Sequence, residues 1–551
     1  MDYISINRRL EKSFAENWER DALSNYQGTT ITYCELATRI ARMHIAFEKC
    51  GLQRGDRIAI CARNQSNWGV SFLAALTYGA VPVPLLHEFK SESIHYLVNH
   101  SEAKVLFVDE SIWENLSESE MPGLLVVVQM NNMKTLFSAS PDLNETWWGM
   151  DELLKKKYPN GYGPSDVKYF QEQPDDLALI NYTSGTSGFS KGVMIPFRAL
   201  GVNLNLAGTV AEPQMNCTSE VVALLPSAHM YGLMFEFLFE MTIGAHVHFL
   251  TRLPSPKVIL KAFSEIRPDI IIAVPLIIEK IYKSQIKPIA DQSKAYLSIP
   301  ILGQQIQKKI RTGLIDAFGG RFEEVILGGA AFNPEAEDFL RRIHFPFTVG
   351  YGMTECAPLI TYAKWYKTKK GSCGKAIPGC EIRIDSKNPS KIPGEIQIKG
   401  DNVFLGYYKN RKATKAVFTN DNWFKTGDMG IMDPEGFLYL RGRSKCMILS
   451  ANGQNIYPEE LEAVINNASY VTESLVVEDD GGLTALIYPD YHQAAIDGMS
   501  AEEVQERILG NLPEINKLLP SYAQIKKMEF LAEDFERTPK KSIKRYLYQR
   551  K

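Results

Sequence analysis

Residues 182–192, Tyr-Thr-Ser-Gly-Thr-Ser-Gly-Phe-Ser-Lys-Gly, combine several hydroxyl side chains, three glycines and a lysine. Glycine lets backbone N–H groups turn toward an anion, while hydroxyls add donors and lysine adds a mobile positive charge. These are the parts of a polyphosphate-binding loop, although a solvated Ser/Gly loop has a similar composition. The binding residues predicted here are Thr183, Ser184, Gly185, Thr186, Ser187, Gly188 and Lys191.

The same stretch does not fit a Walker P-loop. That motif requires Gly-Lys-Ser/Thr, with the lysine at the start of a helix. Here Ser190 precedes Lys191 and Gly192 follows it. The apolar run 177–180 predicts a buried strand that leads into the loop.

Two later motifs add groups suited to a nucleotide. In residues 350–355, Gly-Tyr-Gly-Met-Thr-Glu, Tyr351 can pack on a purine face and Thr354 can donate to a phosphate oxygen. Glu355 is a hard oxygen ligand of the kind that Mg²⁺ prefers. The motif Trp-Phe-Lys-Thr-Gly-Asp ends at Asp428, whose ionised carboxylate can accept hydrogen bonds from both ribose hydroxyls.

In this order, the motifs resemble those of the adenylate-forming superfamily, which includes acyl-CoA synthetases, firefly-type luciferases and peptide-synthetase adenylation domains. The family loop reads Tyr-Thr-Ser-Gly-Thr-Thr/Ser-Gly-x-Pro-Lys-Gly-Val, and here Ser190 replaces the proline. The resemblance implies that the loop closes over the β- and γ-phosphates of ATP and that Thr186 and Glu355 hold Mg²⁺. Residues 328–332 and 450–456 look most like those of medium- to long-chain fatty acyl-CoA synthetases.

The resemblance also assigns residues outside these motifs. His229, in Pro-x-x-His-x-x-Gly, would lie beside ATP at the entrance of the acyl pocket, although a core histidine fits the pattern equally well. The apolar side chains that follow it are read either as a pocket wall or, with more weight, as core. The residues implied to bind ATP or coenzyme A are His229, Gly329, Ala330, Tyr351, Gly352, Thr354, Asp428, Arg443, Lys445 and Gly453.

The chain departs from the family near its end, where the family reads Pro-x-Thr-x-x-Gly-Lys-Ile-x-Arg. Alignment on Thr-Pro and Ile-x-Arg places Ser542 at the position of the family's lysine, whose charge serves adenylation. A serine hydroxyl cannot supply that charge. Our hypothesis is that Lys541 does so after a shift of one residue, and a solvated basic tail is the alternative reading. The predicted catalytic residues are Lys191, Thr354, Glu355 and Lys541.

Buried strands that alternate with helices predict a parallel sheet covered by helices. The strand candidates include 57–60, 81–85, 103–108, 221–226, 270–274 and 325–327. The polar stretch 110–172 is read as a surface connection. With the resemblance, this predicts an α/β fold with a large multi-sheet N-terminal adenylation domain, residues 1–443. A small, mobile α+β C-terminal domain, residues 444–551, would turn about a hinge at Lys445.

The composition narrows the class of protein. The chain has 551 residues, is 45% hydrophobic and carries a formal net charge of −3, which is typical of a multidomain globular protein without a nucleic-acid partner. Its eight cysteines form no Cys-x-x-Cys pair, which argues against a zinc site and fits reduced cytoplasmic thiols. The most apolar window, residues 230–250, is too polar for an integral membrane segment, and peripheral membrane contact stays open.

The implied reaction joins a carboxylic acid, favoured as a fatty acid, to coenzyme A through acyl-AMP. It consumes ATP and requires Mg²⁺. Two alternatives remain at this point. One is an acyl-AMP ligase that loads a separate acyl carrier protein. The other is a pseudoenzyme that binds ATP or acyl groups, which Ser542 suggests. The presence of Lys191, Glu355, Asp428 and Arg443 argues against it.

Overall fold

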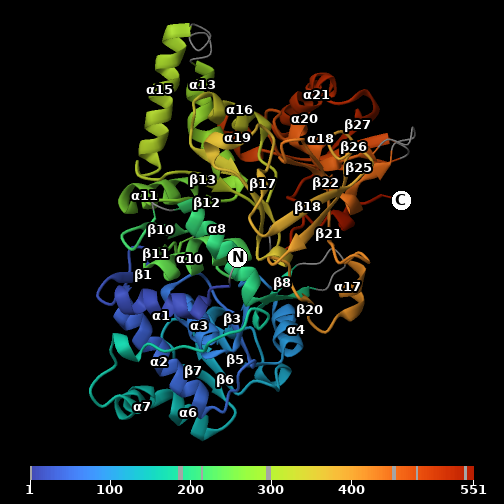
Figure 1. Ribbon diagram of the computed structural model, residues 1–551. Coiled ribbons are helices and arrows are strands. Elements are labelled where there is room, and N and C mark those ends of the chain that lie inside the picture. Colours follow the sequence, from blue (N-terminus) through green and yellow to red (C-terminus); the bar gives the residue numbers. More distant parts are fainter. Residues whose placement is uncertain are drawn as a thin grey trace.

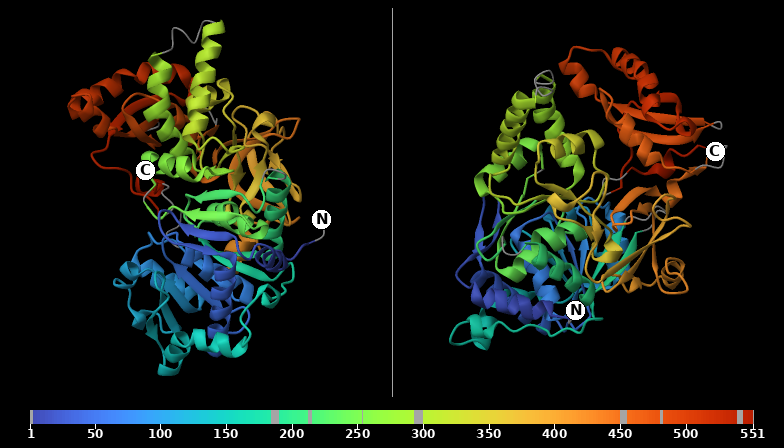
Figure 2. Two further views of the ribbon diagram at one scale, coloured as in Figure 1. Left: turned by 90° about the vertical axis from the view of Figure 1, so that its left-hand side faces the viewer. Right: turned by 45° about the horizontal axis from the view of Figure 1, so that its top comes forward.

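The structure is a computed structural model that describes residues 3–183, 190–211, 215–252, 254–292, 300–449, 455–479, 482–538 and 543–550. The α/β prediction is confirmed: several sheets with flanking helices make up a large N-terminal body, and a smaller C-terminal part lies beside it (Figures 1 and 2). No helix among these residues is both long and apolar enough to cross a membrane.

The first sheet has the strand order β4-β3-β5-β6-β7, and all neighbouring pairs are parallel except β6 with β7. Its strands are β3 (Arg57–Cys61), β4 (Val81–Leu85), β5 (Ala103–Val108), β6 (Val126–Gln129) and β7 (Thr135–Ser138). The helices that precede β5 in the chain are α1 (Ile6–Glu16), α2 (Tyr33–Lys49), α3 (Ser66–Tyr78) and α4 (Ser91–Ser101). The predicted strands at 57–60, 81–85 and 103–108 are therefore confirmed.

The reading of residues 110–172 as a surface connection is wrong. Every residue of β6 is buried, and this strand lies between β5 and β7 in the sheet. The segment also contains α5 (Glu110–Trp113), α6 (Pro141–Trp148) and α7 (Met150–Lys157). The apolar run Leu124-Leu125-Val126-Val127-Val128 was the available signal for this strand, and it was overlooked because the rest of the segment is polar.

The second sheet has the order β10-β11-β1-β2, and a parallel bridge between Val221 and Ile270 connects it to a third sheet, β12-β13-β14. The strands are β1 (Asp21–Asn25), β2 (Thr30–Thr32), β10 (Glu220–Ala223), β11 (His246–Phe249), β12 (Ile271–Ala273), β13 (Val325–Leu327) and β14 (Phe347–Val349). Since β10, β12, β13 and β14 run parallel to their neighbours, their carboxyl ends meet at one edge.

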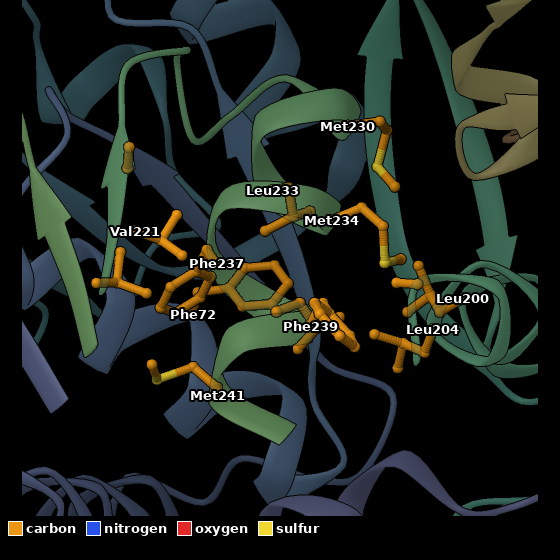
Figure 3. Close-up of a cluster of buried hydrophobic side chains, with 14 of the residues drawn as sticks. Phe72, Leu200, Leu204, Val221, Met230, Leu233, Met234, Phe237, Phe239 and Met241 are labelled. Carbon is orange, nitrogen blue, oxygen red and sulfur yellow. The ribbon is translucent and has the colours of Figure 1, made fainter. Parts of the chain in front are cut away.

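A helix after β10 packs into the core between these sheets. It comprises α9 (Met230–Leu233), a π-helical turn Met234–Leu238 and α10 (Phe239–Ile243). Phe237 is 1% exposed, and its ring centroid lies 6.1 Å from that of Phe72. Figure 3 shows both side chains in one cluster of buried hydrophobic residues. Leu233, Phe237 and Leu238 are thus core residues, whereas Phe235 is only partly buried and contacts Tyr231.

Smaller antiparallel sheets follow. They contain β8 (Leu177–Thr183), β9 (Lys191–Pro196), β15 (Tyr351–Gly352), β16 (Leu359–Tyr362), β17 (Lys375–Ala376), β18 (Cys380–Asp385), β19 (Gly394–Gly400), β20 (Gly406–Tyr407), β21 (Phe424–Met432) and β22 (Leu438–Arg443). The remaining N-terminal helices are α8 (Phe197–Ala211), α11 (Pro256–Ile266), α12 (Pro275–Ile281), α13 (Lys287–Gln292), α15 (Pro300–Ala317), α16 (Pro334–Arg342) and α17 (Arg411–Ala416). Of these, α13 and α15 project beyond the main body (Figures 1 and 2).

The C-terminal part has a hydrophobic core of its own around Ile465, Ile487 and Ile508. Its elements are β23 (Ile448–Leu449), β24 (Asn455–Ile456), α18 (Pro458–Ile465), β25 (Val471–Asp479), β26 (Gly482–Pro489), α19 (Tyr491–Ile496), α20 (Ala501–Gly510), α21 (Leu512–Leu518) and β27 (Ile525–Phe530). Polar contacts join it to the N-terminal body, among them an ion pair of 3.1 Å between Arg441 and Glu460.

Glu240, in the core helix, is 1% exposed, and its carboxylate accepts no hydrogen bond from another residue in the described part of the chain. Burial raises the pKa of Glu240 to about 8. The folded protein therefore binds a proton here that the unfolded chain releases near pH 4.5. By linkage, this group's contribution to stability is full below pH 4.5 and is lost as the pH rises toward 8.

We predict that Glu240→Gln removes this pH dependence. Relative to the variant, the wild type should lose up to about 1.4 kcal/mol of unfolding free energy per pH unit between pH 5.5 and 7.5. Urea unfolding at several pH values measures the difference, and Glu506→Gln, at an exposed position, serves as the matched control. Parallel stability curves for wild type and Glu240→Gln would contradict the prediction.

Candidate functional site

The loops that carry the sequence motifs follow the carboxyl ends of neighbouring parallel strands. The His229 segment follows β10, Gly329 and Ala330 follow β13, and Tyr351 comes just after β14. In sheets of this type, ligands bind outside the carboxyl ends of the strands. The topology therefore brings segments that are far apart in sequence to one edge, as the motif analysis requires.

Asp428 and Arg443 face each other across the antiparallel pair β21 and β22. The Tyr351 hydroxyl donates a 2.7 Å hydrogen bond to Asp428 Oδ2, and Arg443 Nε lies 3.3 Å from Asp428 Oδ1. Burial raises the pKa of Asp428, and the positive charge of Arg443 opposes that rise. Because carboxylate oxygens accept more than one hydrogen bond, this arrangement holds the carboxylate in place while leaving acceptor positions for a diol.

Lys191, Tyr407 and Glu355 form a second polar group. Pairing of β9 with β20 brings Lys191 Nζ to 4.6 Å from the centroid of the Tyr407 ring. The Tyr407 hydroxyl donates a 2.9 Å hydrogen bond to Glu355 Oε1, and Glu355 and Thr354 are both buried in a short turn, Thr354–Cys356. Burial raises the pKa of Tyr407, with a further contribution from Glu355, so the phenol keeps its proton and donates.

The ends of the predicted phosphate loop are fixed by the hairpin of β8 and β9. Thr183 and Lys191 are register partners, and Thr183 Oγ1 lies 3.5 Å from the Lys191 carbonyl oxygen. Within the loop, the predicted binding residues lie outside the described residues, as do Gly453 and Lys541. The loop residues concerned are Ser184, Gly185, Thr186, Ser187 and Gly188.

The two glycine positions that bear on the site differ in role. Gly329 has φ +87°, and a Cβ there would meet only Val274 Cγ1, at 3.9 Å, so Gly329 and the exposed Ala330 form an open surface. At Gly352, by contrast, a Cβ would lie 2.2 Å from the Pro358 carbonyl oxygen. Gly352 therefore permits the close approach of β15 and β16, which positions Tyr351.

His229 begins helix α9, and its Nδ1 accepts a 3.4 Å hydrogen bond from the Tyr231 backbone N–H. It is partly buried at the edge where the strands end. The Tyr231 hydroxyl donates to the Ile326 carbonyl at 2.9 Å, and the same ring lies 3.2 Å from where a Cβ of Gly328 would be. Tyr231 thus connects the His229 segment to the β13 loop.

Sequence reasoning missed Tyr231 and Tyr407 as site residues. Tyr231 had a signal, since it is an aromatic residue inside the motif Pro-x-x-His-x-x-Gly, but neither its contact nor that of Tyr407 is visible without the tertiary structure. Lys445 lies exposed in the short turn Ser444–Cys446, directly after Arg443.

Comparison with known proteins identifies the family. A family model described as "AMP-binding enzyme" matches residues 10–408, and one described as "AMP-binding enzyme C-terminal domain" matches residues 446–551. The chain belongs to the AMP-binding enzyme family. The resemblance to the adenylate-forming superfamily is therefore confirmed.

Curated relatives of this AMP-binding enzyme include long-chain-fatty-acid–CoA ligase FadD15 of Mycobacterium tuberculosis, 27% identical over 484 residues, 82% of this chain and 76% of the relative. The peroxisomal long chain acyl-CoA synthetase 6 of Arabidopsis thaliana is 27% identical over 513 residues, 86% of this chain and 71% of the relative.

Solved structures share the fold. O-succinylbenzoate coenzyme A synthetase from Bacillus subtilis, in complex with ATP and magnesium ion, has a TM-score of 0.74 at 23% identity and covers 98% of both chains. The anthranilate CoA ligase AuaEII, in complex with anthranoyl-AMP, has a TM-score of 0.78 at 18% identity and covers 99% of this chain and 96% of the other. Likeness at this level of identity concerns the fold alone.

We predict that Tyr351→Phe weakens ATP binding by about tenfold, because it removes a hydrogen bond to a charged carboxylate, worth about 1.5 kcal/mol. The ring remains, so kcat should change less than the KM for ATP. Tyr362→Phe is the matched control, since it also removes a tyrosine hydroxyl that bonds a carboxylate, but that carboxylate belongs to Glu324 and not to Asp428. Equal effects of the two substitutions on the KM for ATP would contradict a positioning role for Tyr351.

Proposed function

We propose that this AMP-binding enzyme joins a carboxylic acid to coenzyme A in an AMP-forming reaction, and that its acid is a long-chain fatty acid. The observation that supports the proposal is a pair of contact groups from distant motifs. Lys191 lies against Tyr407, which bonds Glu355. Tyr351, four residues before Glu355, bonds Asp428. The names of the curated relatives support the acid class.

In the first half-reaction, a carboxylate oxygen of the acid attacks the α-phosphorus of ATP. The bond to the oxygen that bridges the α- and β-phosphorus atoms breaks, and pyrophosphate leaves with that electron pair. We assign the ribose hydroxyls to Asp428 and the α-phosphate to Thr354. The Lys191 ammonium would offset the charge that collects on the departing pyrophosphate.

The surroundings of these residues fit such a substrate. The open surface at Gly329 and Ala330 has room for a flat base. Tyr407 holds one oxygen of Glu355, a contact of the kind that orients a ligating carboxylate. Glu355 and Thr186 would hold Mg²⁺, which when bound neutralises phosphate charge.

For the second half-reaction, we propose that residues 1–443 form the adenylation domain and that residues 444–551 turn about Lys445. The rotation would bring Gly453 toward the site and exclude water from acyl-AMP. The thiolate of coenzyme A then attacks the acyl carbon, and AMP leaves. The separate C-terminal core and the exposed position of Lys445 support this division.

An apolar surface beside the site supports a fatty acid. Phe235 and Val274 are partly buried side chains packed with Tyr231 and Ile272, between the His229 segment and the ends of β12 and β13. A carboxylic acid with an alkyl chain would bury that chain here, and each buried methylene would contribute roughly 0.8 kcal/mol.

All eight cysteines are free thiols, which supports a cytoplasmic location.

We predict that the purified protein, supplied with Mg·ATP, coenzyme A and a panel of acids, forms acyl-CoA best with long-chain fatty acids. Pyrophosphate release and acyl-CoA mass are measured together, with Lys191→Ala, purified in the same way, as the control for contaminating activity. Acyl-AMP without acyl-CoA would instead favour a ligase that loads a carrier protein. No pyrophosphate with any acid, despite ATP binding, would favour a pseudoenzyme.

We also predict that Lys541→Ala slows pyrophosphate release in the first half-reaction by about 100-fold, because it removes the cation that we assign to the reacting groups. Lys540→Ala is the matched control and should retain the rate. If Lys541→Ala adenylates at the wild-type rate, Lys541 does not replace the family's lysine, and Ser542→Lys becomes the informative variant.

A further inference from the structure

A cluster of three polar side chains lies on the second sheet, outside the site described above. Glu220 begins β10, and His246 and His248 lie on the neighbouring parallel strand β11. Glu220 and His246 are register partners, and side chains two residues apart on a strand share a face. The sheet therefore directs one carboxylate and two imidazoles into the same small space.

The ligand atoms of this cluster already converge. Glu220 Oε2 lies 3.0 Å from His246 Nδ1 and 2.6 Å from His248 Nε2, and all three ligand atoms lie within 4.8 Å of one another. Ligand atoms around one tetrahedral zinc ion are about 3.3 to 3.6 Å apart, given bond lengths of about 2.0 to 2.2 Å. A small rotation of the Glu220 side chain, which is 29% exposed, opens the required space.

Two hydroxyl side chains, Ser24 and Thr30, lie next to His246 on the side away from Glu220 and contact it through Ser24. His246 Nε2 lies 2.7 Å from Ser24 Oγ, which lies 2.6 Å from Thr30 Oγ1. Hydroxyls can donate or accept, so Ser24 can accept from Nε2–H when Nδ1 carries no proton. That tautomer leaves the Nδ1 lone pair directed at Glu220 and available to a metal, and such outer partners fix the ring of a ligating histidine.

We infer that Glu220, His246 and His248 bind one zinc ion, with water at the remaining coordination position. Two imidazoles and one carboxylate form a set that zinc takes readily, whereas Mg²⁺ prefers oxygen ligands. The side chains of His246 and His248 are 13% and 16% exposed, so the ion is shielded yet reachable from solvent. This site does not depend on the proposed function.

The place of the cluster in the fold indicates a structural role. Glu220 begins β10, while the His229 segment follows the opposite end of this strand. The ion would link β10 to β11 directly and, through Ser24, to β1. The cysteine spacing argued against a zinc site, but a site built from histidines on one strand and a carboxylate on another has no such local signature.

The test is zinc binding to the full-length protein without a histidine tag, because a tag would bind the metal itself. The protein is stripped with a chelator and dialysed against micromolar Zn²⁺ with millimolar Mg²⁺, and zinc per chain is measured by mass spectrometry. We expect one zinc ion per chain and a higher Tm in the presence of zinc. Cobalt substitution should give the visible absorption of a tetrahedral centre.

Variants distinguish zinc bound by these three ligands from zinc bound nonspecifically at the protein surface. Glu220→Gln and His248→Gln should each abolish stoichiometric binding, and Ser24→Ala should weaken it by about 10- to 100-fold. His492→Gln, at an exposed position in α19, is the matched control and should bind zinc normally. Circular dichroism without metal establishes that each variant is folded. Substoichiometric zinc in the wild type, or unchanged binding in folded Glu220→Gln and His248→Gln, would overturn the inference.

Discussion

The parallel alignment of β10, β12, β13 and β14 is the constraint on which the rest of this structure depends. Each of these strands has only three or four residues, and most of their side chains are buried. Burial on this scale leaves little room in these strands for side chains that contact a nucleotide. The loops at the carboxyl edge must therefore provide them. Lys191 lies in β9 and Asp428 in β21, two strands of the smaller sheets, and Glu355 lies in the turn after β15.

Within the site, two tyrosines hold the two key carboxylates. Tyr351 donates to Asp428, and Tyr407 donates to Glu355. A phenol fixes the orientation of a carboxylate without cancelling its charge, which a lysine or arginine in the same place would do. Glu355 thus remains suited to a cation, and Asp428, with Arg443 at one side only, remains an acceptor for hydroxyl groups.

Features that depend on a short stretch of sequence could be predicted from the sequence alone. Apolar runs located most of the buried strands, and motifs with several matching residues in family order located Tyr351, Thr354 and Asp428. Features created by pairing distant segments were not predictable in this way. The contact of Tyr407 with Lys191 required the pairing of β20 with β9, and the meeting of Glu220 with His246 required the register of β10 and β11. The strand Val126–Gln129, by contrast, had a local signal in the apolar run 124–128 that was overlooked.

The end of β22 has a mechanical consequence. Arg443 is its last residue and pairs with Asp428, and the turn Ser444–Cys446 follows with no intervening linker. If the C-terminal part rotates about Lys445, the change is taken up by a few backbone dihedral angles next to Arg443, the residue that contacts the Asp428 carboxylate. With so few rotatable bonds at the pivot, the C-terminal part would rotate along one defined path with little translation. A ligand bound at Asp428 would also influence the direction in which the C-terminal part rotates, because Arg443 contacts Asp428 directly before the pivot.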